Sequence, residues 1–465
     1  MKRNQISICI FITTVILLIV YKPHPSSLSI HVTNYFVDAV FLLLSETLLL
    51  IKYSKNQLDV FEPLTIVSFF YLCMFYVAPI HDIHNGLFTW YGYSLFEFGP
   101  LTSFFVFLGF LSFYIFYTII KVPKNYTTNH PIIKTLNVSR LRRFSLIVYG
   151  ICFLANVYYM QRVGGNSLLY MLTLGIAGSS NTIETTDAAL GFISMLSYCL
   201  PTATLLYWEY SNSIKIKTLL FIPMLMLQVA RGFRFFVIQI AITFISYIFL
   251  KKGSRPNVKT IVACVIAFMI PVLIMTTFRN SIRDGEGIDT SIINSELAEE
   301  SFEAAVWENF RIYQNVYGMV GVIPAKYPYC YFDEIIIGTA VMFIPRIIWP
   351  DKPSMYGGEG LSELIGSNIG SGQAYPSLGE FYYSLGILGI IIYMGIYGWW
   401  MGRVRKRYMK EGTGADGLDI IVFSVLLGTN LQLIIRGYMP SNFWYVVFAV
   451  LPVYIIRKIR HIKTL

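Results

Sequence analysis

Long apolar stretches alternate with short polar segments along almost the whole chain. Each stretch has about 16 to 24 residues, close to the roughly 20 that an α-helix needs to cross a bilayer. The pattern therefore predicts an all-α polytopic membrane protein with about 12 transmembrane helices. The expected spans lie near residues 5–21, 34–51, 62–80, 99–120, 143–162, 189–208, 217–231, 233–250, 259–277, 378–402, 418–435 and 441–457.

One long polar segment, residues 278–377, interrupts this alternation and carries many acidic residues. It separates about nine expected helices in residues 1–277 from about three in residues 378–465. Inside it, apolar positions at helical spacing over residues 295–320 predict an amphipathic helix. Residues 334–349 are apolar but short, which favours a re-entrant or interfacial segment over a span.

Charge gives this arrangement an orientation. Only 13% of the residues are charged, against about 25% in soluble domains. If the N-terminus is cytoplasmic, the inner segments hold about 25 of the 36 basic residues, the bias that cytoplasmic loops show. We therefore expect both termini in the cytoplasm and the long segment outside the plasma membrane. The net charge of +10 then reflects orientation and does not indicate nucleic-acid binding.

Several arginines fall on the expected outer side, against this bias. They are Arg231 and Arg234, Arg279 just after a span, and Arg436 between the last two spans. An arginine near the lipid boundary is costly and suggests a function. A phosphate or diphosphate at the membrane surface is a natural partner for its planar fork. Interfacial snorkelling, or stabilisation of a helix C-terminus, remains the alternative.

Further candidates lie in and just after the long segment. Residues Phe343 to Met355 alternate apolar, proline and basic positions, and would present Arg346 and Lys352 either to lipid headgroups or simply to solvent. Glu380 lies in the outer end of an apolar stretch, where a carboxylate has a function or pairs with an arginine.

Cysteine and histidine spacing predicts no metal site, because the chain has no CxxC pair and no Cys/His cluster. His81 and His84 are expected in a solvated outer loop. Asp38 and Glu46 lie about two helical turns apart in an expected span, and we expect donors on neighbouring helices to meet them. We expect no cofactor.

In their order, these pieces resemble the Wzy-type oligosaccharide repeat-unit polymerases, which make O-antigen and enterobacterial common antigen. The Gly-Phe-Arg ending at Arg234 resembles a short Gly-x-Arg turn of that family. Phe343 to Met355 resembles its F-I-P…W-P-x-K/R-P-S-M segment, and Pro376 to Gly386 resembles the stretch that opens the span after the long loop. Arg436 matches an arginine between the last two spans.

The resemblance covers roughly residues 217–450 and implies a membrane-embedded glycosyltransferase without a nucleotide-sugar donor. It would transfer a growing glycan from undecaprenyl diphosphate to a repeat unit on a second such lipid, at the outer face of the bacterial inner membrane. Preorganised arginines would stabilise the leaving diphosphate, and a carboxylate would accept the acceptor's proton. The expected catalytic residues are Arg234, Arg279, Arg436 and Glu380, and the expected substrate-binding residues are Arg231, Arg346, Lys352, Arg311 and Tyr382.

Two other functions remain open. A flippase or transporter of lipid-linked oligosaccharides would also have many spans, but with charge at mid-membrane depth and short outer loops. An O-antigen ligase would transfer glycan to a lipid A core, and such ligases usually carry an outer-loop histidine, which residues 278–377 lack. A polysaccharide chain-length regulator is a candidate protein partner, and nucleic acid is not expected.

Overall fold

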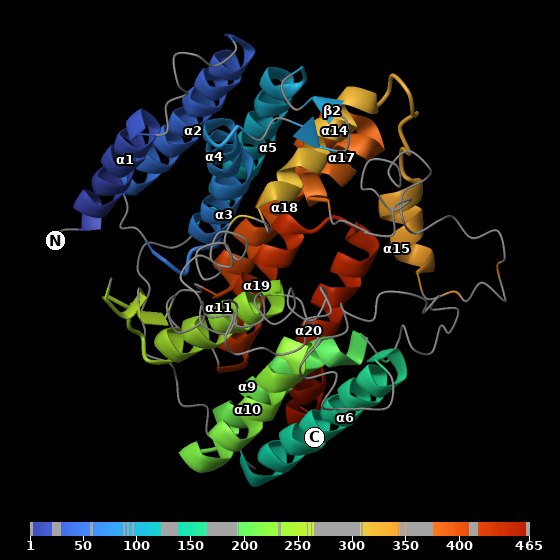
Figure 1. Ribbon diagram of the computed structural model, residues 1–465. Coiled ribbons are helices and arrows are strands. Elements are labelled where there is room, and N and C mark those ends of the chain that lie inside the picture. The colour runs from blue at the N-terminus through green and yellow to red at the C-terminus, as the bar shows by residue number, and fades with distance from the viewer. Residues whose placement is uncertain are drawn as a thin grey trace, which may run out of the picture.

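The computed structural model is a helical bundle (Figure 1), and in the part of the chain that it describes seven helices are long and apolar enough to cross a membrane. These are Ile30–Ser54, Pro63–His84, Gly99–Ile119, Val138–Arg162, Ile387–Tyr408, Gly417–Ile435 and Met439–Ile459. The residues described are 3–20, 29–55, 59–86, 89–90, 93–94, 97–121, 138–164, 193, 195–230, 234–257, 259–261, 263–264, 307, 310–342, 344, 349, 375–408 and 417–461.

The N-terminal part of the bundle contains α1 (Arg3–Val20), α2 (Ser29–Lys55), α3 (Pro63–Leu72), the π-helix η1 (Cys73–Val77), α4 (Ala78–His84), α5 (Gly99–Ile119) and α6 (Val138–Gly164). The strands β1 (Thr89–Trp90) and β2 (Tyr93–Ser94) form one short antiparallel pair. Next come η3 (Ser197–Cys199), α9 (Leu200–Tyr210), α10 (Ile214–Ala230) and α11 (Arg234–Lys251).

The C-terminal part begins with η5 (Arg311–Tyr313), α14 (Gln314–Val322), η6 (Asp333–Ile337) and α15 (Gly338–Val341). It ends with α17 (Ser377–Leu385), α18 (Ile387–Tyr408), α19 (Gly417–Ile435) and α20 (Met439–His461). Most of the expected long segment and most of the expected span 259–277 lie outside the described residues.

Two hydrophobic cores meet along α11 and α19. One core surrounds α3, α5, α14, α17 and α18, and the other surrounds α6, α9, α10 and α20. Helix α19 contributes to both, and 83% of the residues in its most apolar window are buried, as expected for a helix that is apolar on all sides. It lies in the middle of the bundle in Figure 1 and packs against α3, α9, α11, α18 and α20.

Glycines allow α5 and α18 to pack closely along their length. A Cβ at Gly398 would overlap the backbone carbonyl oxygen of Phe113, and one at Gly402 would meet Ile120 and the backbone of Tyr117. Small residues at such positions are what brings membrane helices together, because lipid provides no hydrophobic force between them.

This packing makes Gly398→Ala destabilising. The obstruction is backbone and cannot rotate away, so we expect a loss of roughly 1–3 kcal/mol, the usual cost of overpacking. A lower unfolding temperature of the purified protein in detergent would report it. Gly150→Ala on α6 is the matched control, since a Cβ there meets nothing within 4 Å and alanine gains helix propensity. Equal unfolding temperatures for the two variants would contradict the close approach of α5 and α18.

Three sequence predictions need correction. The expected span 378–402 is broken at Gly386, whose φ of +61° ends α17, and the long helix begins at Ile387. In the expected amphipathic helix 295–320, Trp307 is helical, and the continuously described part from residue 310 contains a 3₁₀ turn followed by α14, which begins at Gln314. Helix α14 is buried on nearly all sides, so this described part lacks the exposed polar face that the sequence predicts.

The third correction concerns His81 and His84, which lie on α4 and not in a solvated loop. His81 is 8% exposed and the neighbouring Asp82 is 1% exposed. Apolar residues of α3 and η1 precede them at helical spacing, so the helix simply continues four residues beyond the expected end of the span at 80.

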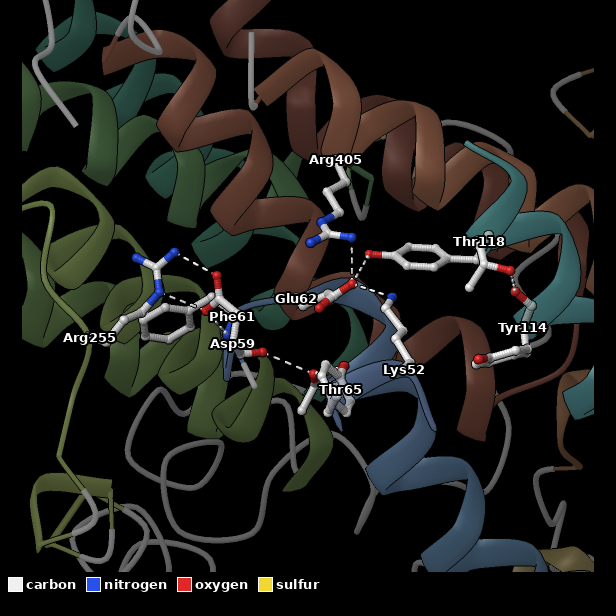
Figure 2. Close-up of polar contacts among 11 residues, drawn as sticks. Lys52, Asp59, Phe61, Glu62, Thr65, Tyr114, Thr118, Arg255 and Arg405 are labelled. Carbon is white, nitrogen blue, oxygen red and sulfur yellow. Dashed lines mark hydrogen bonds and ion pairs between the residues drawn. The ribbon is translucent and has the colours of Figure 1, made fainter. Parts of the chain in front are cut away.

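Ion pairs fasten the helix ends at one end of the bundle, which we call the Arg405 end. Glu62 is 3% exposed and accepts contacts from Lys52 Nζ at 2.5 Å and Arg405 Nη1 at 2.6 Å (Figure 2). The hydroxyl of Tyr117 donates to the same carboxylate at 3.1 Å. Beside it, Arg255 pairs with Asp59 at 2.6 Å. The contacts of Glu62 join α2, α5 and α18 to the start of α3 through one buried carboxylate.

Candidate functional site

At the opposite end of the bundle, the turn between α19 and α20 presents Arg436. The guanidinium of this half-buried residue lies over the ring of Phe235, 5.0 Å from its centroid. Phe235 is in the first turn of α11, which begins at Arg234. The antiparallel packing of α11 on α19 thus brings two of the expected arginine positions together. We call this region the Arg436 end.

The backbone of this turn is held from three sides. The carbonyl oxygen of Arg436 accepts hydrogen bonds from Ser377 Oγ at 2.8 Å and from Asn442 Nδ2 at 2.6 Å. The next amide, of Gly437, donates to the carbonyl of Tyr375 at 2.5 Å. Tyr438 has a φ of +73°, which non-glycine residues seldom adopt, so the surrounding contacts hold the chain in an uncommon conformation here.

Glu380 fixes the other side of the same turn. It is fully buried, and both carboxylate oxygens accept from the amide of Met439, at 2.7 and 2.8 Å. Met439 opens α20, so the carboxylate lies at a helix N-terminus, where the macrodipole favours negative charge. Glu380 therefore links α17 to the turn that carries Arg436.

A cluster of aromatic side chains that includes Phe235 supports the guanidinium of Arg436. The ring of Phe235 packs at a tilt against that of Phe236, with 4.3 Å between centroids, and the ring of Phe236 lies 5.9 Å from that of Tyr198. Tyr445 of α20 meets Tyr198 edge to face at 4.4 Å and donates its hydroxyl to Gln239 at 2.6 Å. The platform under Arg436 thus consists of packed rings from three helical elements, and it has little freedom to move.

A second polar cluster joins Arg311 of η5 to Asp82 of α4. The Nε of Arg311 donates to Asp82 at 3.1 Å, and Asp82 also accepts from Tyr313 at 2.9 Å and Gln314 at 3.1 Å. Burial raises the pKa of Tyr313 well above its ordinary value, so its hydroxyl stays a donor. Beside this pair, His81 stacks on Trp307 with centroids 4.1 Å apart. The cluster anchors the start of α14.

Tyr382, the remaining described candidate, is buried between helices. Its hydroxyl donates to the carbonyl of Ile323 at 3.0 Å, and its ring stacks on Phe105 at 5.7 Å. The side chain of Arg234 and all of Arg231, Arg279, Arg346 and Lys352 lie outside the described residues.

The two acids expected in α2 both meet donors from neighbouring helices, as predicted. Asp38 accepts a hydrogen bond from Ser103 of α5, and Glu46 accepts one from Thr14 of α1 at 2.7 Å. In the described part of the chain, no group of three or more His, Cys, Asp or Glu side chains could hold a metal ion.

The arrangement suits the stabilisation of an anion. A half-buried arginine whose backbone is fixed before any ligand arrives needs little reorganisation when negative charge develops beside it. The sequence pattern singled out Arg436 and Glu380 but missed Ser377, Asn442 and Asp82. For Asn442 there was a usable signal, because a polar side chain in an apolar span is rarely without a role.

Comparison with known families gives one clear match. A family described as O-antigen polysaccharide polymerase Wzy matches residues 5–462, nearly the whole chain. Comparisons with curated proteins and with solved structures give no match. Proteins of this family are glycosyltransferase-type polymerases that act on lipid-linked oligosaccharides in a membrane. The chain is therefore a multi-pass membrane protein that belongs to the O-antigen polysaccharide polymerase Wzy family.

Proposed function

We propose that this O-antigen repeat-unit polymerase transfers the growing glycan from undecaprenyl diphosphate to a repeat unit on a second undecaprenyl diphosphate. The acceptor hydroxyl oxygen forms a bond to the donor's anomeric carbon, and the bond from that carbon to the diphosphate oxygen breaks. The hydroxyl proton passes to a base, and undecaprenyl diphosphate leaves with the negative charge.

The fixed position of Arg436 carries this proposal. Its guanidinium would meet the diphosphate as negative charge grows on the leaving oxygen, and a bidentate arginine contact suits that group. Arg234 and Arg279 would share the charge. Arg346, Lys352, Arg231, Arg311 and Tyr382 would contact the glycan or the lipid headgroup.

Glu380 is our candidate for the base that accepts the acceptor's proton, and its contacts also give it a positioning role. Both of its oxygens are engaged by the amide of Met439, so its firmest role is to position Arg436. A positioning role predicts that Glu380→Gln alters the rate and the apparent affinity for lipid-linked substrate together. Loss of a base would lower the maximal rate alone and change its dependence on pH.

We place the reaction at the outer face of the inner membrane, at the Arg436 end. Basic side chains at the Arg405 end support this orientation, since cytoplasmic helix ends favour Lys and Arg. Lys52, Arg255, Arg405 and Arg457 all lie at that end. A chain-length regulator would meet the polymerase beside the same outer surface.

Complementation of a polymerase-deletion host that makes the matching repeat unit tests the proposal. With the host's O-antigen ligase also deleted, we expect a ladder of glycan lengths attached to the lipid carrier. An O-antigen ligase would leave single repeat units on the carrier in that host, and a flippase would do the same. Either of these results would overturn the proposal.

A further inference from the structure

A deep groove on the flank of the bundle is lined by α1, α2 and the continuous helix formed by α3, η1 and α4. Its cavity volume is about 460 Å³, within the range of about 300–1,000 Å³ typical of ligand sites. Nearly all of its lining is apolar, with Leu17, Leu49, Phe69 and Leu72 among the contributing side chains. Figure 1 shows α1 and α2 side by side at the edge of the bundle, next to α3 and α4.

The groove runs most of the way across the membrane. It extends from Thr65 near the Arg405 end to His81, a length of about 24 Å at 1.5 Å per helical residue. The hydrocarbon core of a bilayer is about 30 Å thick. Leu17 and Phe69 are 48% and 60% exposed although both line the groove, so the groove is open to the side.

Hydrogen bonds hold α1 at a fixed distance from its neighbour. Thr14 donates to Glu46 at 2.7 Å, and the hydroxyl of Tyr35 donates to the carbonyl of Leu18. Glu46 is the only acid among the described residues that line the groove. Its contact with Thr14 therefore fastens α1, the outer wall of the groove, to α2.

The far end of the groove is aromatic and then polar. His81 and Trp307 line it and stack on each other, and Arg311 pairs with Asp82 one residue further along α4. Trp is favoured at the level of lipid headgroups. A long apolar channel that ends in such a cluster matches a lipid with one long chain and an anionic headgroup.

The same end is connected to the candidate site. Arg311 leads directly into α14, and α14 packs on α17, where Gly379 faces Met319 and Val316. Glu380 follows Gly379 and holds the Arg436 turn. His81 and Glu380 both lie at the end of the bundle away from the Glu62–Arg405 ion pair. The continuous helix α3–η1–α4 begins beside Glu62 and ends at His84, and α18 begins just after α17 and carries Arg405 near its other end.

We propose that this groove holds the polyprenyl chain of a lipid-linked glycan, with its diphosphate at the His81–Trp307 end. The inference rests on the proposed function and names the place where one of the two lipids is bound. The groove offers one continuous path for a single unbranched chain of isoprene units, while a phospholipid would have to leave its second acyl chain outside.

Photo-cross-linking tests the occupant. A photoreactive p-benzoylphenylalanine replaces Leu17 in the full-length protein, reconstituted in vesicles of phosphatidylethanolamine and phosphatidylglycerol with labelled undecaprenyl diphosphate. The matched control carries it at Ile16, which is 55% exposed on the same helix and does not line the groove. We expect several-fold more labelled adduct at position 17, suppressed by unlabelled undecaprenyl diphosphate but not by added phosphatidylglycerol.

Three outcomes would overturn the groove assignment. They are equal adduct at positions 16 and 17, an adduct only with phospholipid, and an adduct with a second copy of the chain. The polymerisation assay on the same vesicles separates the two proposals. Polymer without the adduct at position 17 refutes the groove alone, and the adduct without polymer supports the groove while refuting the proposed reaction.

A second variant measures the same site through activity. Leu17→Trp fills the groove from its outer wall, so we expect a several-fold higher KM for the lipid-linked repeat unit with kcat little changed. Ile16→Trp places the same ring on the lipid side and should leave both values unchanged. An unchanged KM for Leu17→Trp would contradict occupancy of the groove during the reaction.

Discussion

Replacing Arg436 with lysine is expected to lower the rate of polymerisation by about 10²-fold or more while the protein still folds. Lysine keeps the charge but loses the planar fork that can contact two oxygens of a diphosphate at once. The turn should survive, because Ser377 and Asn442 hold the backbone carbonyl of residue 436 and not its side chain. The measurement is the yield and length of the glycan ladder in a deletion host, at equal protein level in the membrane.

The chain offers a matched control for this variant. Arg403 also lies over an aromatic ring, 4.8 Å from the centroid of Trp399, but near the Arg405 end of α18. Arg403→Lys removes the same fork from a stacked arginine and should leave the ladder unchanged. A normal ladder from Arg436→Lys, or an equal loss from both variants, would contradict the role given to Arg436.

Glu62→Gln is expected to cause the largest loss of stability, about 3–5 kcal/mol, because it removes the negative partner from a buried group of charges. Lys52 and Arg405 both contact this carboxylate, and in the variant they would face each other across a neutral amide. A lower unfolding temperature in detergent and a lower amount of protein in the membrane would report the effect.

A more exposed ion pair serves as the control. Asp419 pairs with Arg457, and their side chains are 26% and 20% exposed. Water screens such a pair, so Asp419→Asn should cost no more than about 1 kcal/mol. If Glu62→Gln unfolded at the same temperature as Asp419→Asn, the ion pairs at the Arg405 end would not be what fastens these helices.

The helical bundle and its order along the chain were predictable, because hydropathy is a local property of each segment. The break at Gly386 was not, since residues on both sides of it are apolar and a hydropathy window passes through the turn. There the backbone adopts a φ of +61° and the hydroxyl of Tyr329 packs against the glycine. That contact joins residues far apart in the sequence, and no local pattern reveals it.

The sequence allowed Arg436 to be predicted as a candidate, but it did not reveal the partners of the buried acids Glu380 and Asp82. Arg436 stood out because the sequence predicts it between two spans, on the expected outer side, where basic residues are disfavoured. The partners of Glu380 and Asp82 could not be predicted from spacing. Glu380 meets the amide of Met439, and Asp82 meets Arg311, more than 200 positions away along the chain. Burial of Asp82 therefore depends on a tertiary contact, which explains why its neighbours looked like solvated loop histidines.

Reconstitution of the purified chain in lipid vesicles with purified undecaprenyl-diphosphate repeat units tests the central claim most directly. We predict a ladder of glycan lengths, with one undecaprenyl diphosphate released for each new glycosidic bond and no requirement for a nucleotide sugar. Movement of the labelled lipid between leaflets without any ladder would contradict the account and indicate a transporter.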